Sequence, residues 1–238
     1  MQSYLIFTLT SSLGAMGELA GHERRGSLDY PGRSAIIGFL GAAMGIDRGG
    51  DFSALDALDM AVAIFDTGTL LRDYHTFETV PGTRVKHPNS RPESLREARK
   101  KTAAETTITL RDYRVGAFYG VAVWGDDLDK VADFLNHPHY TLYLGRKSCP
   151  LSAPPGAMVV EAETAEEALT QLILPPWRKN QDRNVARTLI CGSEDGEIIH
   201  DVPINRGLRH FTARRIERRD VNIEVMQDNT RIHARNRG

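Results

Sequence analysis

Four short apolar segments in the first two thirds of the chain predict buried strands. They are residues 3–9 (SYLIFTL), 60–66 (MAVAIFD), 116–124 (GAFYGVAVW) and 140–145 (YTLYLG). Most are rich in β-branched and aromatic side chains, a composition typical of strands. We therefore expect these four segments to build the sheet of the protein.

Residues 33–45 (RSAIIGFLGAAMG) are apolar on most sides, which predicts a well-buried helix. Pro31 lies near the expected start and Gly45 at the expected end, which are positions that these residue types favour. A shorter helical piece is expected over residues 53–58.

Residues 126–137 (DDLDKVADFLNH) predict a second, amphipathic helix. Asp126 or Asp127 can cap its first turn. Its apolar side chains recur at the spacing i, i+3, i+4 and i+7, which places them on one helical face. They are Leu128, Val131, Ala132 and Leu135.

The resulting order is strand, helix, strand, strand, helix, strand. This order predicts an α+β fold of the ferredoxin-like (RRM-like) type, which many RNA-binding domains share. The two middle strands are separated by about 50 residues, which is far longer than an ordinary loop. Strand-like patterns at 69–78 and 105–113 flank this insertion, so we expect a long basic β-hairpin over about residues 77–106. Its polar tip is expected to be mobile without a ligand.

Beyond Pro150 the sequence predicts a small β-rich C-terminal region. Residues 164–174 begin with a Thr164 and Glu167 capping box and predict a short helix. Three short strands are expected over 186–192, 197–204 and 210–218. The chain is therefore divided into a ferredoxin-like RNA-binding domain over 1–150 and a C-terminal region over 151–238.

Composition narrows the class of protein. A hydrophobic fraction of 41% and a charged fraction of 26% are those of an ordinary globular protein. The longest apolar run is too short to span a bilayer, and the first residues lack the basic region of a signal peptide. Cys149 and Cys191 have no zinc-binding spacing. We therefore expect a cytoplasmic protein without a metal.

The net charge of −1 hides a segregated distribution. Basic residues gather over 84–101 and again over 206–219, whereas acidic residues gather over 51–59, 126–133 and 161–167. Such segregation suggests that one face meets a polyanion. For any single cluster, a solvated surface is the alternative.

Several segments resemble the CasD family in order and spacing from about residue 2 to residue 151. They are GRSAIIGFLGAAMGIDR (32–48), LLRDYHTF (70–77), TTITLRDY (106–113) and YTLYLGRKSCPL (140–151). CasD is the subunit that holds the 5′ end of the guide RNA in Cascade, the type I-E CRISPR surveillance complex. Members of the family are similar to a ferredoxin-like domain with a protruding hairpin called the thumb. The thumb of the family corresponds in position to the basic insertion that the pattern above predicts.

The resemblance implies a non-catalytic, cytoplasmic subunit of this ribonucleoprotein complex. It would bind the 5′ handle of the crRNA, cap the backbone of CasC subunits and lie near the large CasA subunit. Target DNA would be contacted only through the complex. The resemblance implies no cofactor, no membrane and no homo-oligomer. Because related subunits of type I-C systems cut guide precursors, a metal-independent endoribonuclease is the alternative function.

The loop LGRKS (144–148) is a candidate phosphate site. It is not a Walker A loop, because the upstream glycine is missing and Pro150 stands where a helix should begin. Arg146 and Lys147 can donate to phosphates together with backbone N–H groups. The alternative is a basic turn after an edge strand, with Gly145 in a conformation that other residues avoid.

The segment RDYHT (72–76) has two interpretations. Tyr74 can stack on a base or hydrogen-bond to it, and His75 can contact RNA. In the nuclease alternative His75 would act as general acid or base, together with Tyr74 and a lysine of the insertion, without a metal. A His satisfied within a strand is an equally good explanation for His75.

Two further basic regions complete the candidate interface. Arg33 and Ser34 stand at a helix N-terminus, where free N–H groups favour an anion, and a simple cap is the alternative. The insertion can gain affinity for RNA through counterion release. The predicted RNA-binding residues are Arg24, Arg25, Arg33, Ser34, Arg72, Tyr74, His75, Thr76, Arg84, Lys86, Arg91, Arg99, Lys100, Lys101, Arg111, Tyr113, Arg146, Lys147 and Ser148.

Overall fold

The computed structural model describes residues 1–17, 24–80, 89–101, 104–178, 184–208 and 210–225. This part of the chain is a mixture of helices with one large, mainly antiparallel sheet. The strands are β1 (Gln2–Gly14), β2 (Arg24–Arg25), β3 (Asp59–Asp66), β4 (Thr69–Thr79), β5 (Glu105–Trp124), β6 (Met158–Ala162), β7 (Val185–Asn205) and β8 (His210–Glu224). The helices are α1 (Arg33–Ala43), α2 (Ser53–Asp56), α3 (Arg91–Lys100), α4 (Leu128–Asn136) and α5 (Ala165–Leu169), with a 3-10 turn at Pro176–Arg178.

The sheet has the strand order β6-β1-β5-β3-β7-β8. Strands β2 and β4 also pair with β5, and among the described strands only the β2 pairing is parallel. The long strand β5 therefore belongs to two structures. Residues 118–123 lie between β1 and β3, whereas residues 105–115 pair with β4.

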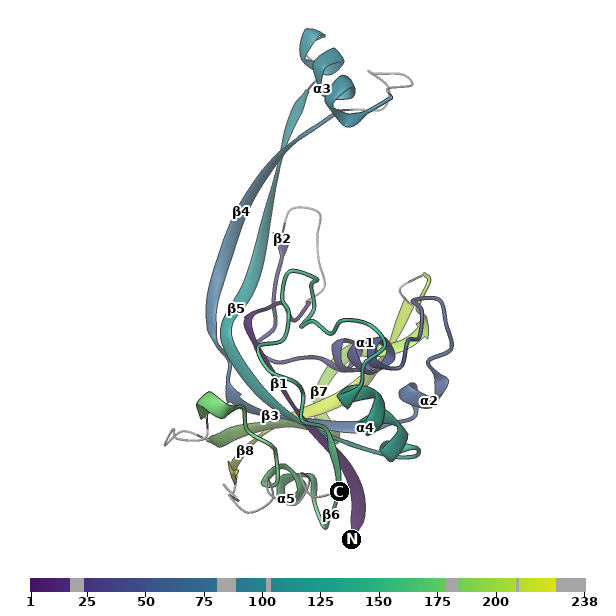
Figure 1. Cartoon of the computed structure of the whole chain (residues 1–238), viewed down its shortest axis with the longest axis vertical. Coiled ribbons are helices and arrows are strands. Elements are labelled where there is room, and N and C mark those ends of the chain that lie inside the picture. Colours follow the sequence, from purple (N-terminus) through teal and green to yellow (C-terminus); the bar gives the residue numbers. More distant parts are fainter. Residues whose placement is uncertain (18–23, 81–88, 102–103, 179–183, 209, 226–238) are drawn as a thin grey trace.

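Strands β4 and β5 leave the body together as a long two-stranded arm that ends in α3 (Figure 1). The sequence of β5 changes where the arm begins: the body half is apolar and buried, and the arm half alternates threonines with larger side chains. Gly68 and Gly116, both at positive φ, mark this junction. A Cβ on Gly68 would lie 2.6 Å from the carbonyl oxygen of Val115, so the close approach of the chains there requires glycine.

Apolar side chains are buried on both faces of the body sheet. On one face Leu5 and Phe7 pack with α1 and α4, and on the other Tyr4 and Ile6 pack with α5. This follows from strand geometry, because successive side chains point to opposite faces. Two covered faces explain why residues 4–7 (YLIF) form a continuous apolar run instead of alternating with polar residues.

Most predicted elements are present. Helix α1 covers most of 33–45, and Gly45 follows it at φ +75°, as expected for a residue just past a helix end. In α4 the four predicted apolar side chains are all buried. Its N-cap is Asp127, in a left-handed conformation and without a side-chain cap bond. The 164–174 helix is shorter than expected and ends at Leu169, but Thr164 does accept from the N–H of Glu167 (3.2 Å).

The predicted strand 140–145 is wrong. This segment forms only an isolated bridge between Tyr143 and Pro150, and the place beside β1 is taken by β6. Leu142 and Leu144 are nevertheless buried in the core. The alternation of these two leucines therefore comes from a buried loop. The local pattern does not show which segment pairs with the free edge of β1, and in the structure that segment is β6.

The C-terminal residues join the same sheet as the N-terminal ones. Strand β6 pairs with β1, and β7 pairs with β3. The expected strands 186–192 and 197–204 are parts of β7, which is interrupted by a register shift between Gly192 and Glu197. No helix in the described part of the chain is long and apolar enough to cross a membrane.

Candidate nucleic-acid interface

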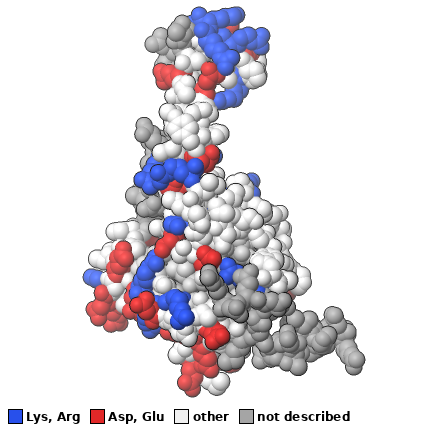
Figure 2. Space-filling view, turned by 90° about the vertical axis from the view of Figure 1, so that its left-hand side faces the viewer, with Lys and Arg blue, Asp and Glu red and all other residues white. Residues whose placement is uncertain are grey.

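Lys and Arg side chains gather at the tip of the arm and again near its base, with a neutral stretch between them (Figure 2). The base is where β2, β4 and β5 meet, so three separate segments of sequence supply its side chains. Strand alternation divides these side chains between two faces of the arm.

One face carries the Asp112 cluster, which consists of Arg24, Arg72 and Asp112. Arg72 donates from Nε (2.7 Å) and Nη2 (3.1 Å) to the two carboxylate oxygens of Asp112. Arg24 approaches the same carboxylate at 3.5 Å. Asp112 is buried, whereas the side chains of Arg72 and Arg24 are 42% and 63% exposed. The hydrogen bonds from Arg72 hold the pKa of Asp112 below its ordinary value.

The other face carries the Tyr113 cluster, which consists of Arg111, Tyr113 and Arg146. The guanidinium carbon of Arg146 lies 4.5 Å from the centroid of the Tyr113 ring, a cation–π arrangement. Arg111 stands two residues before Tyr113, on the same strand face. Arg111 Nε and Arg146 Nη1 are both buried and have no hydrogen-bond partner among the described residues. Buried donors of this kind are costly unless a ligand or water pairs them.

The loop after Leu144 is fixed so that Arg146 reaches Tyr113. The N–H of Leu144 donates to Cys149 (2.8 Å), and the N–H of Ala15 donates to Leu144 (3.0 Å). Gly145 has φ +85°, and a Cβ there would lie 1.7 Å from the carbonyl oxygen of Ala15. Only glycine fits there, as the alternative interpretation of this loop, a basic turn, expected for Gly145. Lys147 and Ser148 are exposed on the same turn.

The segment RDYHT lies on β4 in the arm. Tyr74 is 62% exposed and pairs across the ribbon with Leu110. His75 pairs with Thr109, and its ring lies 6.0 Å from that of Phe77. Because neighbouring residues alternate, Tyr74 and Thr76 share the face of the Asp112 cluster, and His75 lies on the face of Arg111.

The tip of the arm contains α3, a helix that the sequence analysis did not predict. Its N-cap is Ser90, whose hydroxyl accepts from the N–H of Glu93 (3.4 Å). Glu78 fastens the helix to the end of β4: its carboxylate pairs with Arg99, and its carbonyl accepts from Arg91 (2.8 Å).

The remaining predicted residues of the insertion differ in their surroundings. Lys100 lies 3.6 Å from Glu97 on the same helix, and Lys101 is its C-cap. An open hollow is lined by one side of α3, namely Arg91, Pro92, Leu95, Arg96, Arg99 and Lys100. Arg84 and Lys86 lie outside the described residues.

Arg33 and Ser34 lie at the N-terminus of α1 and belong to neither the Asp112 cluster nor the Tyr113 cluster. Arg33 donates to the backbone carbonyls of Leu58 (2.8 Å) and Asp56 (2.6 Å), so its guanidinium is used to hold the segment after α2. Burial, and then the charge of Arg214, lower its pKa. Ser34 is exposed and makes no side-chain cap; the N-cap is Gly32.

The comparisons with known proteins agree with one another. The family model described as CRISPR-associated protein (Cas_Cas5) matches residues 4–219. The chain belongs to the Cas5 family. It is 33% identical over 186 residues to the CRISPR system Cascade subunit CasD of Escherichia coli (strain K12), covering 71% of this chain and 76% of that protein.

Two solved structures resemble this Cas5 chain over most of its length. A chain of a CRISPR RNA-guided surveillance complex superposes with a TM-score of 0.69 and 26% identity, covering 92% of this chain and 90% of the other. A structure described as a Cas protein gives a TM-score of 0.65 and 26% identity, covering 92% and 95%. The large antiparallel sheet and its helices are therefore those of Cas5 structures.

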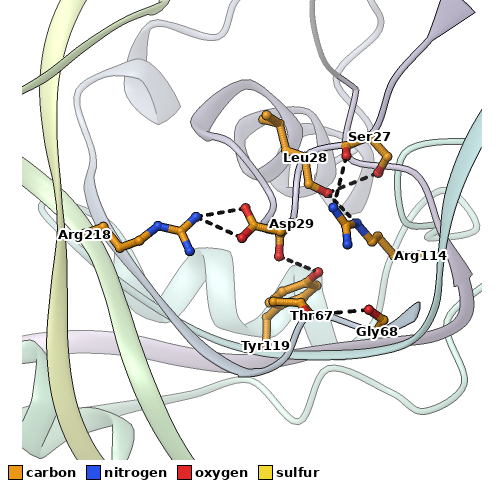
Figure 3. A network of polar contacts seen from close by, with 8 residues as sticks. All are labelled: Ser27, Leu28, Asp29, Thr67, Gly68, Arg114, Tyr119 and Arg218. Atoms are coloured by element: carbon orange, nitrogen blue, oxygen red, sulfur yellow. Dashed lines mark hydrogen bonds and ion pairs between the residues drawn. The ribbon is translucent and has the colours of Figure 1, made fainter. Parts of the chain in front are cut away.

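The C-terminal arginines of this Cas5 chain are mostly occupied by acidic partners from other parts of the chain. Arg206 pairs with Asp56, Arg218 with Asp29 and Arg219 with Glu166. Figure 3 shows one of these pairs: the Asp29 carboxylate faces Arg218, and the carbonyl oxygen of Asp29 accepts from the Tyr119 hydroxyl (3.0 Å). The acidic segments noted in the sequence thus serve partly as internal counter-ions.

Arg114 is a further residue that sequence reasoning missed. It lies on β5 at the base of the arm, across from Leu70 of β4, and donates to the carbonyls of Leu28 (3.1 Å) and Ser27 (3.5 Å), as seen in Figure 3. Asp112 was missed as well, although it stands between two predicted residues. A signal for Asp112 was available. If the segments 69–78 and 105–113 are paired as a hairpin, Asp112 stands opposite Arg72 on the same face, where opposite charges attract.

Proposed function

We propose that this Cas5-family chain is the subunit of a Cascade-type surveillance complex that holds the 5′ handle of the crRNA. The observation that carries the proposal is the Tyr113 cluster, where Arg111 and Arg146 each keep a buried nitrogen without a partner in the described part of the chain. Phosphate oxygens are the acceptors that guanidinium groups prefer. The CasD relative and the matched surveillance-complex chain support the same assignment.

The arm is the thumb of this proposal, and the body is a ferredoxin-like domain. The strand order β6-β1-β5-β3 supports the ferredoxin-like assignment, with β6 in the place first expected for 140–145. The arm of β4, α3 and β5 supports a thumb that extends well beyond the expected 77–106, because pairing begins at Thr69 and Val115. The proposed C-terminal region over 151–238 adds β6, β7 and β8 to the sheet of the body within its described residues.

Within the complex, the subunit caps the backbone of CasC subunits and lies near CasA. It joins as a single copy, and target DNA is contacted only through the assembly. Sequence recognition of the DNA is left to base pairing with the guide, as in other RNA-guided systems. The handle is held by its phosphates and its unstacked bases.

The proposed role is non-catalytic. A nuclease based on RDYHT would need Tyr74 and His75 to face one phosphate, yet they lie on opposite faces of β4. Incubating the purified full chain with repeat RNA in EDTA tests this alternative. Unchanged RNA is expected, and site-specific cuts that disappear in His75→Ala would replace the binder with an endoribonuclease.

Binding itself is tested by titrating fluorescent handle RNA with the full chain at several salt concentrations. We expect the logarithm of the affinity to fall linearly with the logarithm of the salt concentration, because each neutralised phosphate releases counterions. Arg146→Gln should lessen the slope, whereas Lys130→Gln, on the exposed side of α4, is the matched control. Affinity that does not change with salt would contradict the proposal.

A further inference from the structure

The face of the arm opposite the Tyr113 cluster carries a second arrangement of aromatic, apolar and cationic groups. Going outward along β4, this face presents Arg72 and then Tyr74, and β5 presents Asp112 and Leu110 directly across from them. Arg24 of β2 lies beside Leu110. Alternate residues on one strand face are about 7 Å apart, which is within the reach from the base of a nucleotide to its phosphate.

Tyr74 offers an unusually open ring for a side chain in the middle of a strand pair. It is 62% exposed, and Ile108, which follows Leu110 on the same face of β5, is 43% exposed. Together they form an apolar surface whose most exposed member is a planar ring. Stacking on such a ring suits a nucleobase that is not already stacked in a duplex.

The Asp112 cluster next to Tyr74 suits one phosphate. Two guanidinium groups and one carboxylate leave one uncompensated positive charge, which matches the single negative charge of a phosphodiester. Arg72 uses only Nε and Nη2 on Asp112, and its side chain is 42% exposed. Its remaining edge can donate to a phosphate while Asp112 fixes the plane of the guanidinium.

We propose that Tyr74, Arg72 and Arg24 form a subsite for one unstacked nucleotide of a single strand, with Asp112 as its positioning residue. The base stacks on Tyr74, and the phosphate accepts hydrogen bonds from Arg72 and Arg24. This inference rests on the proposed RNA-binding function. It adds the class of ligand, one unstacked nucleotide, and its position on this face, with further phosphates on the face of Arg111 and Arg146. The strand must therefore pass around the base of the arm.

The test uses the full chain and synthetic handle RNA in which 2-aminopurine replaces one base at a time. Stacking changes 2-aminopurine fluorescence, so one position is expected to respond to Tyr74 and the others are not. Tyr74→Leu should remove that response and weaken binding by about ten-fold, in keeping with the usual contribution of one stacked base. Tyr74→Phe keeps the ring and should bind like the wild type. Tyr140→Leu, an exposed tyrosine of the body, is the matched control.

The role of Asp112 is tested by Asp112→Asn, with circular dichroism to confirm folding. A carboxylate that only repelled RNA would give tighter binding when neutralised, whereas a positioning carboxylate gives weaker binding and a smaller 2-aminopurine response. Arg72→Gln should reduce the salt slope of RNA binding by about one. This variant tests the Asp112 cluster if Asp112→Asn does not fold.

The outcomes separate this inference from the function on which it rests. If the wild type binds the handle with a steep salt dependence but Tyr74→Leu binds equally well at every labelled position, the subsite is wrong and the binding function stands. If the wild type does not bind the handle, both are wrong. If Tyr74→Leu impairs capture of the other Cascade subunits and leaves RNA binding unchanged, this face meets protein and the subsite is again wrong.

Discussion

Arg218, near the end of the chain, donates to both carboxylate oxygens of Asp29 at 2.9 and 3.0 Å, across 189 residues of sequence. The pair connects β8 to the segment that leads into α1 (Figure 3). A cation that was a candidate for a polyanion surface is thereby used inside the fold.

The first prediction follows from this pair. Arg218→Gln should lower the free energy of unfolding by up to about 1 kcal/mol, because both side chains are partly exposed and solvent screens them. RNA affinity should not change. Urea unfolding at low and high salt measures the loss, which should shrink as salt rises. Arg215→Gln is the control, since the guanidinium of Arg215 donates to the Gly196 carbonyl instead of an acid. A large loss of RNA affinity in Arg218→Gln would show that this face meets the guide.

The second prediction separates two arginines that the sequence placed in the same site. Arg33→Gln should cost about 1.5–3 kcal/mol of stability, because it removes charged donors from the carbonyls of Leu58 and Asp56. It should leave the salt slope of RNA binding unchanged. Arg146→Gln should leave the stability unchanged and lower the salt slope of RNA binding by about one. Calorimetry and fluorescence anisotropy on both variants measure the two effects. An unchanged melting temperature for Arg33→Gln together with weakened RNA binding would restore Arg33 to the interface.

The third prediction concerns pH. Asp112 has a depressed pKa in the folded chain, first because Arg72 hydrogen-bonds to it. The ionised carboxylate therefore contributes stability that is fully present above its unfolded pKa of about 3.9 and is lost as the pH falls through the lower folded value. The stability difference between the wild type and Asp112→Asn should be constant from about pH 5 to 7 and shrink below about pH 4. Urea unfolding at each pH measures it. A difference that persists unchanged at low pH would contradict the ion pair.

The fourth prediction concerns the tip. Glu78→Gln should loosen α3, because the carboxylate that pairs with Arg99 is lost. Amide hydrogen exchange should become faster in residues 91–100, and exchange in the body should stay the same. Glu97→Gln removes only the pair with Lys100 within the helix and is the matched control. Equal exchange in Glu78→Gln and the wild type would show that other contacts hold the helix.

Local sequence patterns predicted those elements whose structure does not depend on which distant segment they contact. The four apolar residues of α4 and the glycine after α1 follow from helical periodicity and backbone sterics, and both were confirmed. Helix α3 was missed because only Ala98 is buried in it, so it has no apolar stripe. Its usable signal was the cap, Ser90 with Pro92 and Glu93 close behind.

Features that depend on distant pairing could not be predicted. Leu142 and Leu144 alternate like a strand and are buried, but β6 occupies the edge that they would need. Nor does the sequence show that Arg218 meets Asp29. In the candidate site, residue types were sufficient to propose Arg146 and Tyr74, whereas the division into two faces required the register of β4 on β5.

The most direct test of the central claim is photo-crosslinking of 4-thiouridine-labelled handle RNA to the full chain within the assembled complex, followed by mapping of the linked peptides. The account predicts crosslinks to residues 72–76 and 108–114 and to the loop at 145–148. Crosslinks confined to the β7–β8 hairpin, or found only on other subunits, would contradict it.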